Sequence, residues 1–189
     1  TGTRINKYMS QCGYCSRREA DRLIEKGEVW INGTLATMGT KVMPGDTVMV
    51  HHTTITPCQK EYLLAFHKPA GIVCTTSKID KNNVIDYLNF PDRIYPVGRL
   101  DKESTGLLLL TNNGQLMDDI LRGSNYHEKE YIVHVNKPIT DSVLQAMAQG
   151  VPILDTITRP CKIRRMGKDC FYITLTQGLN RQIRRMCEY

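Results

Sequence analysis

Residues 98–112 read GRLDKESTGLLLLTN, and this stretch decides the fold of the region around it. It joins a loop bounded by Gly98 and Gly106 to an apolar run, Leu107–Leu110. The run is much shorter than the roughly 18 apolar residues of a membrane span, so it predicts a buried strand. Asp101 stands in the loop, where an aspartate is ordinarily a turn former whose side chain bonds its own backbone.

Strand and helix patterns follow one another on both sides of this run. Apolar periodicity predicts strands at 62–67, 107–111, 131–135, 157–165 and 170–176. It predicts helices at 84–88, 115–122, 140–149 and 179–188. Such a mixture is typical of an α+β domain built on a mainly antiparallel sheet, and we expect this domain to cover residues 61–189.

The first 50 residues follow another pattern. Apolar spacing predicts a helix over residues 4–13, which Gly13 ends. Ser16, with Glu19 three residues later, predicts a capping box for a second helix that stops at Gly27. The sequence then predicts strands and turns at 29–31, 32–33, 42 and 48–50, the last two forming a hairpin around 44–46. We expect a small module of two helices plus a small sheet at 1–50, and a polar linker at 51–60.

Composition narrows the class of protein. The chain has 189 residues and a net charge of +6, which by itself does not establish a nucleic-acid partner. Seven cysteines, an odd number without a secretory signal, favour reduced thiols and a cytoplasmic protein. Cys12 and Cys15 form the single Cys-x-x-Cys, and no second pair follows at zinc-site spacing. We therefore expect no metal, no cofactor and no membrane association.

Cations gather on the first two predicted helices: Arg4, Lys7, Arg17, Arg18, Arg22 and Lys26. Arg18, Arg22 and Lys26 recur every four residues on one helix face. One interpretation is a solvated face neutralised by neighbouring acids, namely Glu19, Asp21, Glu25 and Glu28. The other is a phosphate-binding surface that gains from the release of condensed counterions. The charges alone leave both interpretations open.

The N-terminal segments Arg4–Tyr8, Cys15–Ala20 and Gly27–Gly33 resemble an S4 RNA-binding domain. The resemblance implies that the six cations contact the phosphates of structured RNA and position it without reading its sequence. S4 domains occur in many proteins, so a non-catalytic RNA-binding or ribosome-assembly protein is an alternative function.

Gly98–Asn112 resembles the first motif of the pseudouridine synthases, in the branch that modifies ribosomal RNA (the RsuA-like family). Lys129–Tyr131 resembles the second motif and Gln177–Met186 the third, with Leu179 departing from the usual pattern. The segments 127–131 and 150–154 favour the members that act on the large subunit. Relatives continue beyond the third motif, so this resemblance implies that the chain is incomplete at its C-terminus.

The resemblance implies an isomerase that acts as a monomer on ribosomal RNA, with transfer RNA as a further candidate, and without a cofactor. Asp101 would be the essential carboxylate, Tyr131 would pack on the base, and Arg184 would pair with Asp101. Ile183 would line the pocket, Arg99 would fill the space that the flipped base leaves, and Arg181 and Arg185 would contact RNA. Asp101 could attack C1′, attack C6 or remove a sugar proton. A hydrolase acting on the glycosidic bond is the other alternative, although it usually needs two carboxylates or a metal.

Overall fold

The computed structural model describes residues Thr1 to Tyr189, which divide into two compact units, residues 1–117 and 118–189. Each unit has its own sheets and core, and every strand pairing within a sheet is antiparallel. The predicted α+β class with a mainly antiparallel sheet is confirmed. None of the helices is long and apolar enough to cross a bilayer.

The first unit begins with two short helices packed on a four-stranded sheet of order β3-β2-β5-β6. The elements of this part are β1 (Thr3–Arg4), α1 (Ile5–Gln11), α2 (Arg17–Glu25), β2 (Val29–Ile31), β3 (Thr34–Leu35), β4 (Lys41–Val42), β5 (Val48–Val50) and β6 (Thr53–Ile55). The Ser16 hydroxyl accepts the N–H of Glu19 at 3.2 Å, so the predicted N-cap of α2 is confirmed. Such a cap stabilises a helix by about 1 kcal/mol.

Two predictions for this region are wrong. The strand at Val42 does not pair with β5; β4 instead pairs with β1, and β5 lies between β2 and β6. Residues 53–55, expected in the linker, form β6, which follows a two-residue turn at His51 and His52 with positive φ. Threonine-rich polar sequence also suits strands, and Ile55 is buried in the core beneath the sheet.

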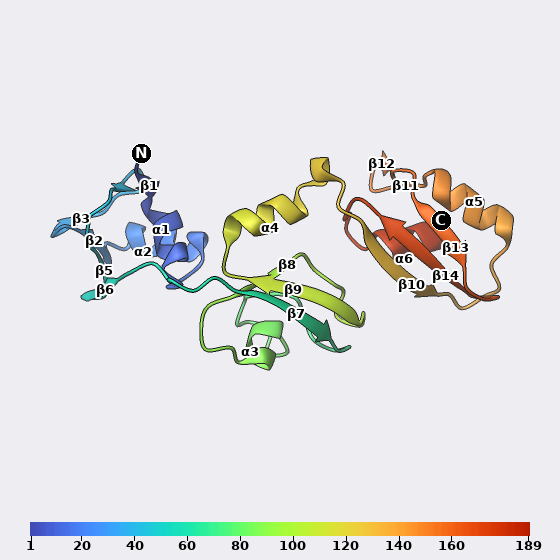
Figure 1. Ribbon diagram of the computed structural model, residues 1–189, viewed down its shortest axis with the longest axis horizontal. Helices are drawn as coiled ribbons and strands as arrows, with labels where there is room; N and C mark the ends of the chain where they lie inside the picture. The colour runs from blue at the N-terminus through green and yellow to red at the C-terminus, as the bar shows by residue number, and fades with distance from the viewer. The chain divides into compact units, whose positions relative to one another are not determined.

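The second part of the first unit is a three-stranded sheet of order β7-β9-β8 with a helix against it (Figure 1, green). Its elements are β7 (Leu63–Lys68), α3 (Val84–Leu88), β8 (Tyr95–Val97) and β9 (Gly106–Thr111), followed by α4 (Gly114–Leu121), within which the division between the units falls. Leu108 and Leu110 of β9 are buried against Val84 of α3, which confirms the apolar run as a buried strand.

The second unit is a sheet of order β10-β14-β13, whose core is completed by two helices. Its elements are η1 (Gly123–Asn125), β10 (Lys129–His134), α5 (Asp141–Gln149), β11 (Pro152–Ile153), β12 (Thr156–Ile157), β13 (Lys162–Arg165), β14 (Cys170–Leu175) and α6 (Gln182–Glu188). The single strand predicted at 157–165 is wrong: Ile157 ends the β11–β12 hairpin, and β13 begins only after Pro160. Proline cannot donate to a ladder, which accounts for the break.

Gly150 closes α5 with φ +125°, a conformation that side chains rarely adopt. A Cβ at this position would lie 2.7 Å from the carbonyl oxygen of Thr158. The chain therefore turns from the helix into the β11–β12 hairpin with backbone in direct contact with backbone.

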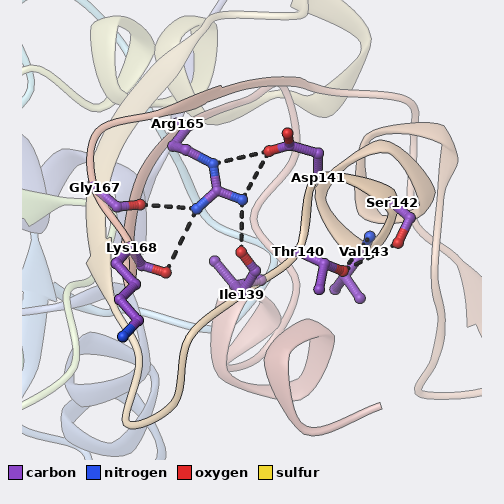
Figure 2. Close-up of polar contacts among 8 residues, drawn as sticks. All are labelled: Ile139, Thr140, Asp141, Ser142, Val143, Arg165, Gly167 and Lys168. Carbon is purple, nitrogen blue, oxygen red and sulfur yellow. Dashed lines mark hydrogen bonds and ion pairs between the residues drawn. The ribbon is translucent and has the colours of Figure 1, made fainter.

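One guanidinium ties together the loop before α5 and the turn between β13 and β14 (Figure 2). Arg165 donates to the Asp141 carboxylate at 2.8 Å, to the carbonyl of Ile139 at 2.5 Å and to the carbonyl of Gly167 at 2.9 Å. These acceptors surround the planar fork, so a single ammonium would not reach all of them.

Arg165→Lys is expected to lower the free energy of unfolding by about 1–3 kcal/mol, because most of these charge-assisted bonds are lost. Urea unfolding followed by circular dichroism measures the change. Arg164→Lys is the matched control, since it keeps a cation over the Tyr172 ring and should cost less than about 0.5 kcal/mol. Equal transition midpoints for the two variants would contradict the clamp.

Candidate active site

Asp101 lies in the loop that joins β8 to β9 and is half-buried. Its carbonyl accepts the N–H of Ser104 at 3.0 Å, which closes a turn directly after it. On the other side, Leu100 packs against the core under the sheet, and its N–H contacts the Cys74 sulfur at 3.4 Å. The loop is therefore anchored on both sides of Asp101, while Arg99 beside it is exposed.

A buried lysine fixes the same loop from below. Lys68, the last residue of β7, is 0% exposed, and its ammonium donates to the carbonyls of Pro69 at 2.7 Å and Lys102 at 3.0 Å. The N–H of Gly71 also donates to the Lys102 carbonyl, at 2.8 Å. A buried cation is tolerated only with such partners. Two donors, the Lys68 ammonium and the Gly71 N–H, thus hold the backbone carbonyl one residue beyond Asp101.

Sequence reasoning missed Lys68, although a signal was present. Leu64, Phe66 and Lys68 follow one another at the period of two that places side chains on the same face of a strand. Because the strand was expected to end at His67, the lysine was not placed on the inward face. Continuing the alternation by one residue would have predicted a buried cation beside the apolar core.

The second unit carries the residues of the other two motifs. Tyr131 of β10 lies opposite Ile173 of β14, and it packs, half-buried, against the same core as Ile183 of α6. Arg184, next to Ile183, is exposed. Tyr131 and Ile183 are thus brought to one core, whereas the pairing of Arg184 with Asp101 of the first unit stays a proposal.

A chain of amides holds the beginning of α6. Gln182 is 4% exposed, and its side-chain oxygen accepts the N–H of Leu179 at 3.2 Å. Its side-chain nitrogen contacts the Gln177 oxygen at 3.4 Å, which also accepts the backbone N–H of Arg159 at 2.6 Å. These bonds set the turn that leads into the helix, and sequence patterns alone did not reveal them.

The remaining predicted RNA contacts differ in their surroundings. Arg181 is exposed at a positive φ of 48°, just before α6, which begins at residue 182 rather than at the predicted 179. Arg185 is half-buried, and its guanidinium donates to the carbonyl and to the side-chain oxygen of Asn180, both at 2.9 Å. Part of its hydrogen-bonding capacity therefore serves the turn itself.

All six cations predicted to contact RNA from the N-terminal module are exposed: Arg4, Lys7, Arg17, Arg18, Arg22 and Lys26. Arg4 lies in β1, before the helix to which the sequence assigned it. Arg22 forms an exposed ion pair with Glu19 at 3.0 Å. Exposed pairs of this kind contribute little and can be exchanged for a phosphate contact.

Cys12 and Cys15 pack, partly buried, against the N-terminal core. Burial raises the pKa of each thiol to about 11. At neutral pH both are protonated, and protonated thiols are poor nucleophiles and poor metal ligands.

Comparisons with known proteins find matches for both parts of the chain. The family model described as RNA pseudouridylate synthase matches residues 62–189, and the model of the S4 domain matches residues 3–48. A dual-specificity RNA pseudouridine synthase RluF from Salmonella typhi is 54% identical over 191 residues, covering 100% of this chain and 66% of the relative. The chain thus spans 66% of the length of this relative.

More distant relatives belong to the same class of protein. The ribosomal large subunit pseudouridine synthase B of Bacillus subtilis (strain 168) is 33% identical, over 98% of this chain and 79% of that protein. A crystal structure of a pseudouridylate synthase superimposes with a TM-score of 0.67 at 25% identity, covering 98% of this chain and 82% of that one. The chain therefore belongs to the RNA pseudouridylate synthase family, and it carries an S4 domain before the region that matches the family model.

Proposed function

We propose that the protein converts a uridine of structured RNA to pseudouridine, with ribosomal RNA of the large subunit as the substrate. The observation that carries this proposal is the half-buried Asp101, whose loop is anchored by the Lys68 ammonium. The chain that contains this loop matches the family model of the RNA pseudouridylate synthases. The names of the relatives, a dual-specificity RNA pseudouridine synthase and a ribosomal large subunit pseudouridine synthase, support the class of substrate.

The chemistry requires one carboxylate and no redox step. The N1–C1′ bond breaks, the detached uracil turns, and a C5–C1′ bond forms while the C5 proton is lost and N1 regains one. We assign the carboxylate to Asp101, acting on the sugar or the base of a flipped uridine. We assign Tyr131 to hold the ring, Ile183 to line the pocket, and Arg184 to pair with the carboxylate. Arg99 fills the vacated stack, and no metal or organic cofactor takes part.

We propose that the chain works in two parts. The S4 module of residues 1–50, whose sheet continues into β6, grips structured RNA, and residues 61–189 carry out the isomerisation. The protein acts as a monomer in the cytoplasm, where ribosomal RNA is made and modified.

The test is incubation of the protein with unmodified large-subunit ribosomal RNA and, separately, transfer RNA, followed by carbodiimide mapping of pseudouridine. A single modified uridine in ribosomal RNA, with no change of RNA mass, is expected. Release of free uracil would instead support the hydrolase. RNA binding without any modified position would support a non-catalytic binder and overturn the synthase.

Arg18→Ala combined with Arg22→Ala is expected to weaken RNA binding several-fold at about 0.1 M salt. Each lost phosphate contact should reduce the slope of log Kd against log salt by about 0.7–0.9, so the pair should reduce it by up to about 1.8. Fluorescence anisotropy with a structured RNA across a salt series measures both quantities.

Lys78→Ala combined with Lys81→Ala is the matched control for this variant. Both lysines are exposed and lie outside the S4 module. Their substitution removes two positive charges, as in the double arginine variant. The control should leave affinity and salt slope nearly unchanged. If both double variants bound RNA with the same Kd and salt slope, the cations of α2 would not be specific contacts for RNA.

A further inference from the structure

Tyr126 combines an unusual backbone conformation with an exposed position. It ends the turn η1 with φ 52° and ψ 34°, in the left-handed region, and the residue as a whole is 58% exposed. Large aromatic residues are rarely found there, since glycine or asparagine closes such turns with less strain. Asn125 directly precedes it, so turn chemistry alone does not explain a tyrosine at this position. An observed outlier of this kind is a reason to look for a function.

Arg159 holds the tyrosine ring in place. Its guanidinium carbon lies 4.3 Å from the centre of the Tyr126 ring. The same guanidinium donates to the carbonyl of Gly123 at 3.1 Å and to the carbonyl of Thr176 at 3.0 Å. Because the guanidinium is fixed at two backbone positions, the ring above it is ordered before any ligand arrives. A pre-ordered aromatic surface binds with little loss of entropy.

The surroundings of the ring suit a nucleic acid. Arg159 also donates its backbone N–H to Gln177, the first residue of the third motif. The Lys129 ammonium lies 4.0 Å from the position that a Cβ on Gly178 would take. A second cation therefore lies against the backbone at Gly178. The nearby acid Glu128 is paired with Lys162 at 2.9 Å, which reduces its repulsion of phosphate.

We propose that Tyr126, braced by Arg159, is a stacking platform for an unpaired base of the bound RNA. The base lies on the exposed ring, and the cations Arg159 and Lys129 favour the phosphates beside it. Aromatic stacking tolerates any base, so the platform recognises an unpaired nucleotide rather than a sequence. The inference rests on the proposed function in taking RNA as the ligand, and it adds a base contact, at Tyr126, that lies outside the three motifs.

The experiment uses the 189-residue protein and an RNA hairpin with a single-stranded loop carrying 2-aminopurine at one loop position at a time. Stacking on a tyrosine quenches this fluorophore, and the titration gives Kd without any turnover. Tyr126→Phe should bind like the wild type, whereas Tyr126→Leu should raise Kd about tenfold and remove the quenching at one loop position. A fully paired duplex of equal length should show no difference between the variants.

Two further variants separate a binding role from a structural one. Tyr126→Gly suits the left-handed backbone but lacks the ring, so its melting temperature should stay close to that of the wild type while Kd rises as for the leucine variant. Tyr87→Leu replaces a tyrosine that is equally exposed, at 57%, on α3, and should leave Kd unchanged.

Wild-type affinity and quenching in Tyr126→Leu would overturn the proposal, and so would an equal loss of affinity for the duplex. These readings do not depend on pseudouridine formation. A protein that stacks the base but modifies no uridine would therefore count against the proposed function and not against the platform.

Discussion

Asp101→Asn is expected to lower the rate of pseudouridine formation by at least about 10³-fold while leaving RNA affinity nearly unchanged. Asparagine has the same shape as aspartate but carries no charge and can serve neither as nucleophile nor as base. The turn should persist, because its bond to Ser104 uses the backbone carbonyl of residue 101. Single-turnover assays with excess protein measure the chemical step, and anisotropy measures affinity.

Glu103→Gln is the matched control for this variant. Glu103 lies in the same loop, is exposed, and loses the same charge on substitution. Its single-turnover rate should stay within about twofold of the wild type, as for surface substitutions in general. Turnover in Asp101→Asn at the rate of the control would remove Asp101 from the mechanism.

Lys68→Met should lower the single-turnover rate by about 10²-fold, the loss that a displacement of about 1 Å can cause in an oriented site. The substitution keeps the length and volume of the side chain but removes the donor from the Pro69 carbonyl and one of two donors from the Lys102 carbonyl. Stability should change by less than about 2 kcal/mol, because the lost hydrogen bonds are offset by the removal of a buried charge. RNA affinity should stay unchanged.

The control is Lys102→Met, which removes an exposed charge and retains the carbonyl that Lys68 binds. It should turn over RNA at nearly the wild-type rate. A single-turnover rate in Lys68→Met equal to that of the wild type would contradict a positioning role. A loss of rate no larger than the fraction of the variant that is unfolded would contradict it too. Circular dichroism of each variant distinguishes these cases.

The sequence predicted local features well because neighbouring residues determine them. The Ser16 cap and the strand at Leu107–Leu110 are confirmed, and the Asn32-Gly33 turn is confirmed by two positive φ angles, of 47° and 77°. Predictions that depended on distant partners were weaker. β1 and β4 have two residues each, too few to show a period, and each exists because it pairs with the other across the module.

The candidate site shows the same limit. Asp101, Tyr131 and Arg184 were identified by their resemblance to the family motifs. The catalytic roles assigned to these residues are proposals. The support beneath them was not predicted, because Lys68 reaches a carbonyl 34 residues further along the chain. The bonds that Gln177 accepts from the Arg159 N–H and that Gln182 accepts from the Leu179 N–H likewise use backbone groups, whose positions leave no mark in a residue pattern.

The close approach of backbone at Gly150 restricts how this protein can evolve. Any other residue there would need both an unfavourable backbone angle and a shift of Thr158, so repair would require several simultaneous changes. Gly33 also has a positive φ, yet a Cβ there would meet no atom within 4 Å, and asparagine could replace it at small cost. Two glycines that look alike in the sequence therefore differ greatly in the substitutions that the fold can tolerate.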